Sequence, residues 1–127
     1  MRDNDILILE LQSPSGDVTA IRVFSVAWRV ETVAQMLVGS YDDPVDLPRM
    51  VHVLEGATMT NVSVSWPSLD TIFVFGDLRL RVFSVTSRVD PRCWQQWSAR
   101  MADGRVLDVG PGQTWTLRER GPKREPQ

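Results

Sequence analysis

The feature that most constrains the fold of this chain is a short segment that occurs twice. RVFSV at residues 22–26 is followed by RVE at 29–31, and the same RVFSV at 81–85 is followed by RVD at 88–90. The copies are 59 residues apart without a gap, and seven of the first nine aligned positions are identical. Unrelated strands share a hydrophobic pattern rather than identities, so the match indicates an internal duplication.

The duplicated unit covers about residues 5–31 and 70–90, because DILIL at 5–9 also resembles DTIFV at 70–74. Both copies are rich in β-branched and aromatic residues, which are typical of strands. Two copies are too few for a solenoid. We therefore expect an α+β fold that is mainly antiparallel β-sheet, built from two duplicated β-units with one principal helix packed on it.

Alternating apolar residues and turn residues place further strands along the chain. Hairpin turns are expected at Gly76-Asp77 and at residues 102–104. Residues 31–38 are expected to be extended. The expected strands cover residues 6–12, 18–26, 61–66, 71–75, 78–85, 94–101, 105–109 and 114–117.

One helix is expected from Leu47 to Glu55. Asp46 can cap its N-terminus, Pro48 suits its first turn, and Gly56 can end it. Four apolar residues fall at helical spacing and would pack on the sheet. They are Leu47, Met50, Val51 and Leu54.

The chain of 127 residues has the length of one domain, expected over residues 1–120, with a flexible Pro-containing tail at 121–127. A single cysteine, Cys93, fits a reducing compartment. No apolar run is long enough to cross a membrane, and the N-terminus lacks the basic region of a signal peptide. These features predict a cytoplasmic protein with no membrane partner.

The charged residues argue against two classes of function. The net charge of −2 lacks the basic excess of a dedicated nucleic-acid binder. The residues that most often carry catalysis are sparse, since His52 is the single histidine and Cys93 has no local catalytic signature. The carboxylates at 42, 43 and 46 lack the spacing of a calcium loop. We expect no catalytic, cofactor or metal site.

Tryptophan and aspartate instead suggest a surface for a protein partner. Five tryptophans exceed what a core of this size requires, and exposed tryptophan is common at interface hot spots. Adjacent aspartates would steer a basic partner towards that surface. The candidate partner-binding residues are Asp42, Asp43, Trp66, Trp94 and Trp97.

Residues 47–117 resemble a family of small bacterial proteins of unknown function with immunity-protein-like relatives. The resemblance rests on LEGAT at 54–58, the hairpin at 70–85, the Trp-led segment at 97–109 and GPG at 110–112. It implies an α+β fold without a catalytic residue. The leading interpretation is a non-enzymatic protein-binding module, such as an immunity or antagonist protein. The alternatives are a small homodimeric regulatory or structural subunit, and a hydrolase with dispersed carboxylates.

Overall fold

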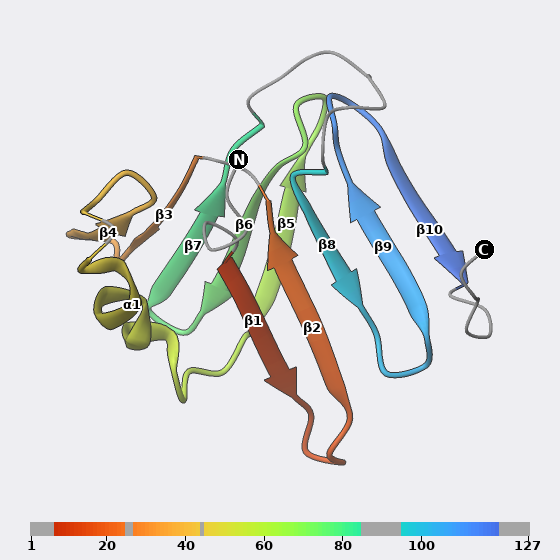
Figure 1. Cartoon of the computed structure of the whole chain (residues 1–127), viewed down its shortest axis with the longest axis horizontal. Coiled ribbons are helices and arrows are strands. Elements are labelled where there is room, and N and C mark those ends of the chain that lie inside the picture. The colour runs from red at the N-terminus through yellow and green to blue at the C-terminus, as the bar shows by residue number, and fades with distance from the viewer. Residues whose placement is uncertain (1–6, 25–26, 44, 85–94, 120–127) are drawn as a thin grey trace.

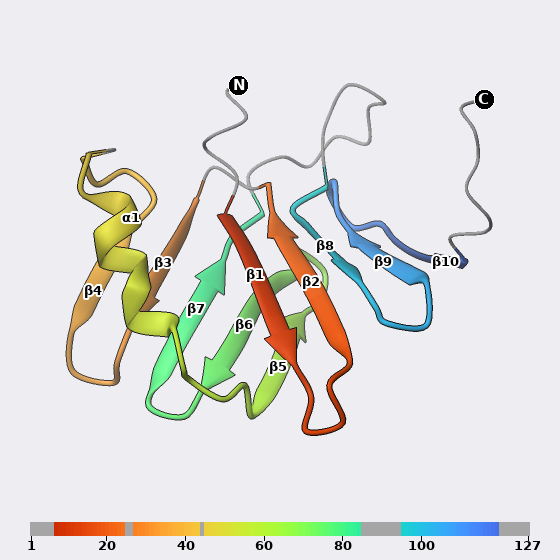
Figure 2. The same ribbon diagram turned by 60° about the horizontal axis from the view of Figure 1, so that its bottom comes forward.

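Two five-stranded antiparallel sheets pack against each other, and one short helical segment lies beside them (Figures 1 and 2). The computed structural model describes residues 7–24, 27–43, 45–84 and 95–119. Sheet A runs in the order β1 (Leu7–Gln12), β2 (Val18–Val23), β8 (Trp97–Arg100), β9 (Arg105–Val109) and β10 (Trp115–Glu119). Sheet B runs in the order β4 (Met36–Gly39), β3 (Trp28–Glu31), β7 (Leu78–Val82), β6 (Asp70–Phe75) and β5 (Asn61–Ser65). The expected α+β class with mainly antiparallel sheet is confirmed.

The hairpins form where the turn residues place them. Gly76-Asp77 joins β6 to β7, and Gly76 has a φ of 63°, which a residue with a side chain rarely adopts. Residues 102–104 join β8 to β9. The expectation that residues 31–38 are extended holds only at the two ends of the segment, because 32–35 form the turn between β3 and β4.

The helix is shorter and less regular than the sequence suggests. Only α1 (Leu47–Met50) is α-helical, and η2 (Val51–Leu54) continues it as a 3₁₀ turn. The β-branched Val51 and Val53 weaken α-helix formation over so short a segment.

The expected helix cap is wrong. The Asp46 carboxylate caps no backbone N–H and accepts from the Arg49 guanidinium at 3.0 Å. The expected packing of the apolar side holds where it is described: Leu54 is buried, and Leu47 and Val51 pack against the core. The side chain of Met50 lies outside the described part.

The strands that carry the two RVFSV segments pair in the same register with one neighbour, although β2 is next to the edge of sheet A and β7 is central in sheet B. Val82 pairs with Trp28 at the start of β3, and Val23 pairs with Trp97 at the start of β8. The next three pairs along each strand keep the same register. Trp97 is therefore the counterpart of Trp28 at an offset of 69 residues, so the gapless repeat does not extend into β8. Duplication stays a prediction, and residues 5–6, 25–26 and 85–90 of the proposed repeat lie outside the described part.

The core fills the space between the sheets and joins them. Trp97 of sheet A packs edge-on against Phe73 of sheet B, with ring centroids 4.9 Å apart and planes at 74°. The Trp97 indole N–H donates to Thr71 Oγ1 at 2.9 Å, and the Thr71 hydroxyl donates to the Leu69 carbonyl at 3.0 Å. Trp97 thus links the sheets by both packing and a buried hydrogen bond.

Candidate functional site

The two aspartates expected to contact a partner lie in the connection between β4 and α1. Asp42 Oδ2 accepts a hydrogen bond from the Gly39 N–H at 2.9 Å, and Asp43 Oδ1 accepts one from the Val45 N–H at 3.0 Å. Each carboxylate therefore organises the local turn, as Asp side chains commonly do. The two aspartates do not converge on a ligand site.

The three candidate tryptophans differ in where the structure places them. Trp66 follows β5 and is 68% exposed, so it is available to a partner. Trp97 is 4% exposed and lies in the core, because strand alternation points it inward together with Ala99. Trp97 is therefore not available for contact with a partner. Trp94 lies outside the described residues, as do Cys93 and the tail at 121–127.

Trp66 and the aspartates do not form one patch. The aspartates follow β4, which is one edge of sheet B, and Trp66 follows β5, which is the opposite edge. Strands in a sheet are about 4.8 Å apart, so the two edges are separated by roughly 19 Å. The structure retains Trp66 as a candidate and separates it from the acidic turn.

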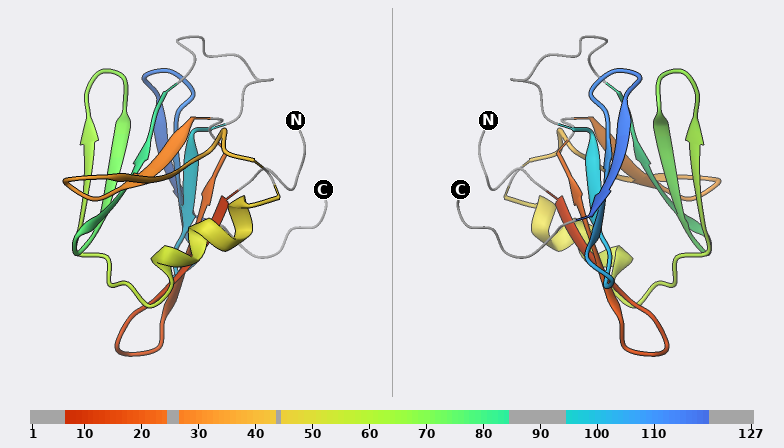
Figure 3. Two further views of the ribbon diagram at one scale, coloured as in Figure 1. Left: turned by 90° about the vertical axis from the view of Figure 1, so that its left-hand side faces the viewer. Right: turned by 90° about the vertical axis from the view of Figure 1, so that its right-hand side faces the viewer.

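The surroundings of Trp66 point to the strand that precedes it. β5 pairs only with β6 among the described strands, so its other side is a free edge. All five of its residues are exposed, and none is charged or proline. On such an edge, alternate N–H and C=O groups face outward and can pair with another strand. Figure 3 shows β5 at the outer margin of its sheet, away from sheet A.

The other three edges of the described sheets are protected. β4 has a register shift in its pairing with β3 and is contacted by α1. β1 carries Glu10 at its centre, and η2 lines a hollow with it. β10 ends in Arg118 and Glu119. Charges, bulges and covering helices are the usual means by which proteins block edge-to-edge pairing. In the part of the chain that is described, β5 is the edge without such protection.

An apolar strip runs along β5. Its register with β6 places Val62 and Val64 on the same face as the buried Phe73 and Thr71. The two valines are nevertheless 38% and 46% exposed. Trp66 directly follows β5 and is also exposed. Residues 61–66 are called the β5 edge below.

Several of the described titratable groups form ion pairs. Hydrogen bonds from Arg29 and Arg81 hold the pKa of the Glu31 carboxyl below its usual value. A backbone hydrogen bond from Arg105 similarly lowers the pKa of Asp103. His52 Nδ1 lies 2.9 Å from Glu55 Oε2 at the exposed helical segment. The lowered pKa values favour the charged forms of Glu31 and Asp103. No group of three His, Cys, Asp or Glu side chains among the described residues is placed to hold a metal ion.

Comparison with protein-family models, curated proteins and solved structures finds no match. The resemblance to immunity-like bacterial proteins therefore stays a prediction. Within the described residues, no helix has the length and apolar character needed to cross a bilayer.

The sequence predicts the strand of the β5 edge but not its position at the margin of a sheet. The alternation of residues 61–66, ended by Pro67, identifies the strand and its exposed tryptophan. Its position at an edge depends on pairing with distant segments, which local pattern does not encode. The absence of charge in NVSVS was the signal available, because a strand open to water on one side usually carries a charged residue.

Proposed function

We propose that this protein is a non-enzymatic protein-binding module that takes an extended segment of a protein partner as a sixth strand of sheet B. The observation that carries the proposal is the β5 edge, which is uncharged and, among the described residues, neither paired on its outer side nor protected. Strand addition uses main-chain hydrogen bonds for affinity and side-chain contacts for specificity. Neither requires a group with a tuned pKa.

The chemistry of the edge defines the partner segment. Facing strands gain from pairs of β-branched or aromatic residues and lose from unmatched charges. Val62 and Val64 therefore favour apolar side chains on the core-facing side, and Ser63 favours a hydroxyl or small polar residue on the other. Trp66 would cover the end of the added strand. The partner segment is an extended, uncharged run of alternating apolar and small polar residues.

A second copy of the chain is the alternative occupant, because the edge is complementary to itself. If two β5 strands pair antiparallel about Ser63, Val62 of each copy faces Val64 of the other. No like charges meet in this register. The homodimer is thus a second candidate function. An immunity or antagonist role would be one use of the first candidate function, the binding of a protein partner.

A charge placed on the edge tests both candidates. Ser63 is exposed, so Ser63→Lys should change the free energy of unfolding by less than about 0.5 kcal/mol while blocking strand addition. Thr116→Lys is the matched control, because Thr116 is exposed on the protected edge strand β10. The probe is a labelled peptide with the sequence of residues 60–66, followed by fluorescence anisotropy. Sedimentation velocity over a range of concentrations reports self-association.

Three outcomes separate the possibilities. A monomer that binds the peptide, with binding lost in Ser63→Lys and kept in Thr116→Lys, supports partner binding. A dimer that dissociates only in Ser63→Lys assigns the edge to a second copy. A monomer that binds no peptide, or either complex surviving Ser63→Lys, refutes the role of the β5 edge.

A further inference from the structure

A hollow of about 470 Å³ lies between the edge strand β1 and the chain that leaves η2, and it is called the β1 hollow below. β1 contributes residues 8–11 to its lining, and the facing segment contributes Val51 and residues 54–57. Phe75, at the end of β6, completes the lining. The volume is within the range of small-molecule sites, which is roughly 300–1,000 Å³. The β1 hollow shares no residue with the β5 edge.

The inner wall of the β1 hollow is apolar and continuous with the core. Leu54 and Phe75 are buried members of the core cluster, so the hollow reaches the space between the sheets. Strand alternation turns Leu9 and Leu11 to the same side, where both are only partly buried. Ile8, on the other side of β1, is 55% exposed. A ligand with an apolar chain would remove this surface from water, which is the main favourable term in association.

The charged residues that line the β1 hollow are both acidic. Glu10 lies on the exposed side of β1, and no basic side chain in the described part of the protein forms an ion pair with it. Glu55 Oε2 lies 2.9 Å from His52 Nδ1, and the Glu55 side chain is 73% exposed. The hollow therefore combines an apolar inner wall with a negatively charged rim, at which Glu10 has no partner of its own.

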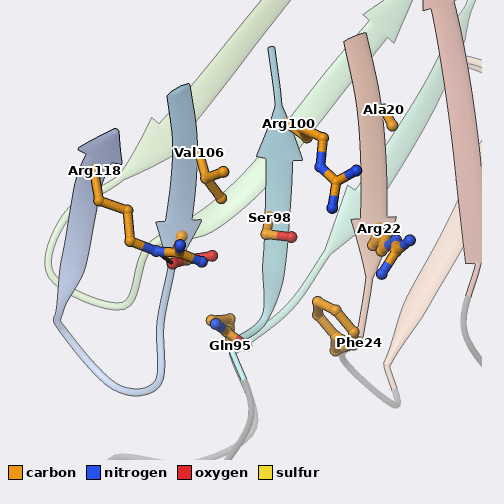
Figure 4. Close-up of a pocket in the computed structure, with 9 residues that line it drawn as sticks. Ala20, Arg22, Phe24, Gln95, Ser98, Arg100, Val106 and Arg118 are labelled. Carbon is orange, nitrogen blue, oxygen red and sulfur yellow. Dashed lines mark hydrogen bonds and ion pairs between the residues drawn. The ribbon is translucent and has the colours of Figure 1, made fainter. Parts of the chain in front are cut away.

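A second hollow, on the outer face of sheet A, has a different set of charged residues. Figure 4 shows Arg22, Arg100 and Arg118 around this hollow of about 240 Å³. Asp108 also belongs to its lining and accepts from Arg118 Nε at 3.0 Å. Of these two hollows, the β1 hollow is the one that combines carboxylates and an apolar wall with no guanidinium group. Its charge favours a cation over an anion of the same shape.

We propose that the β1 hollow binds a small amphiphile that has an unbranched apolar chain and one ammonium group, the chemical class of the alkylamines. The chain lies along Leu9, Leu11 and Phe75. The ammonium group lies at the rim and donates a charge-assisted hydrogen bond to the Glu10 carboxylate, with water accepting from its other N–H groups. Because the chain encloses the hollow on two sides, it suits a small molecule rather than a further strand.

An NMR titration of the ¹⁵N-labelled protein with octylamine, hexylamine and octanoate at pH 7 tests the proposal. At this pH the amines carry a positive charge and octanoate carries a negative one. We expect hexylamine, which is shorter by two methylene groups, to bind about tenfold more weakly than octylamine. Octanoate should bind at least about fivefold more weakly than octylamine. The amide signals of residues 8–11 and 54–57 should shift on binding.

Three results of this titration would overturn the proposal. They are the absence of saturable binding of octylamine, binding of octanoate as tight as that of octylamine, and shifts confined to residues outside the β1 hollow. The second result would assign the hollow to an anionic amphiphile. Since the β1 hollow and the β5 edge are separate, none of these results bears on strand addition.

Variants separate the contributions of charge and of apolar contact. Glu10→Gln should weaken octylamine about threefold without weakening octanoate. Glu119→Gln is the matched control, because Glu119 is an exposed carboxylate on β10, the opposite edge of sheet A. Ala57→Phe fills the hollow and should weaken octylamine at least about tenfold; if this variant fails to fold, the amide shifts of the wild-type protein locate the site. Glu10 is exposed, so Glu10→Gln decides: an unchanged preference for octylamine over octanoate overturns the proposal.

Discussion

Replacing Trp97 by Phe tests whether the buried indole holds the two sheets together. The change removes about three ring atoms, worth roughly 1–2 kcal/mol of transfer and cavity free energy. It also removes the hydrogen bond from the indole N–H to Thr71 Oγ1, worth about 1 kcal/mol. We therefore expect Trp97→Phe to lower the free energy of unfolding by about 2–3 kcal/mol. Urea denaturation followed by far-ultraviolet circular dichroism measures this directly.

A matched variant and a double-mutant cycle isolate the hydrogen bond. Trp115 is 59% exposed, so Trp115→Phe should change the free energy of unfolding by less than about 0.5 kcal/mol. Thr71→Val leaves the Trp97 N–H without an acceptor, at a cost of about 1–3 kcal/mol, but leaves nothing unpaired when position 97 is already Phe. We expect a coupling energy of about 1–2 kcal/mol. Additive effects of the two substitutions would refute the reasoning.

Three further predictions concern the helical segment, the Glu31 ion pairs and one tight turn. Leu54→Ala should lower the free energy of unfolding by about 2–4 kcal/mol, because Leu54 is buried in the core cluster; an unchanged urea midpoint would contradict that packing. Glu31→Gln should cost about 1 kcal/mol at pH 7. Because folding lowers the pKa of Glu31 below 4.5, its contribution exists above that pH and is lost as pH falls through the lowered value; equal losses at pH 7 and pH 3 would show that charge is irrelevant. Gly110→Ala should destabilise by at least about 1 kcal/mol in thermal unfolding, since Gly110 has a φ of 85° and an added Cβ would lie 2.8 Å from Gln96 Cγ; an unchanged melting temperature would disprove that crowding.

The strands and hairpins were predictable because their signals are local. Alternation in LRLRV and the Gly-Asp turn before it determine β7 and its pairing with β6 without reference to the rest of the chain. The helix cap was harder to predict, because the Asp46 carboxylate could accept a hydrogen bond either from the backbone or from Arg49. The sequence shows a capping residue, but it does not show that Arg49 competes for the same oxygen.

The sites were less predictable because they depend on which strands become neighbours. The exposure of Trp66 and the burial of Trp97 are decided by edge and central positions in two sheets. Glu10 and Glu55 are far apart in sequence, and only the position of residues 51–57 beside β1 brings them to one hollow. A net charge of −2 argues against a general nucleic-acid binder, but it is an average over the chain and does not show where acidic side chains gather.

The matching registers of the two sheets separate what serves folding from what differs for another reason. Trp28 and Trp97 are both buried, and the central apolar pairs are the same in kind, so the core imposes equal demands on both sheets. The outer faces are not equivalent: Glu31 neutralises two arginines in sheet B, whereas the residue at the matching register position in sheet A is Arg100. The free edges also differ, since β5 lacks the charges that protect β10. The requirements of the shared core therefore explain neither difference.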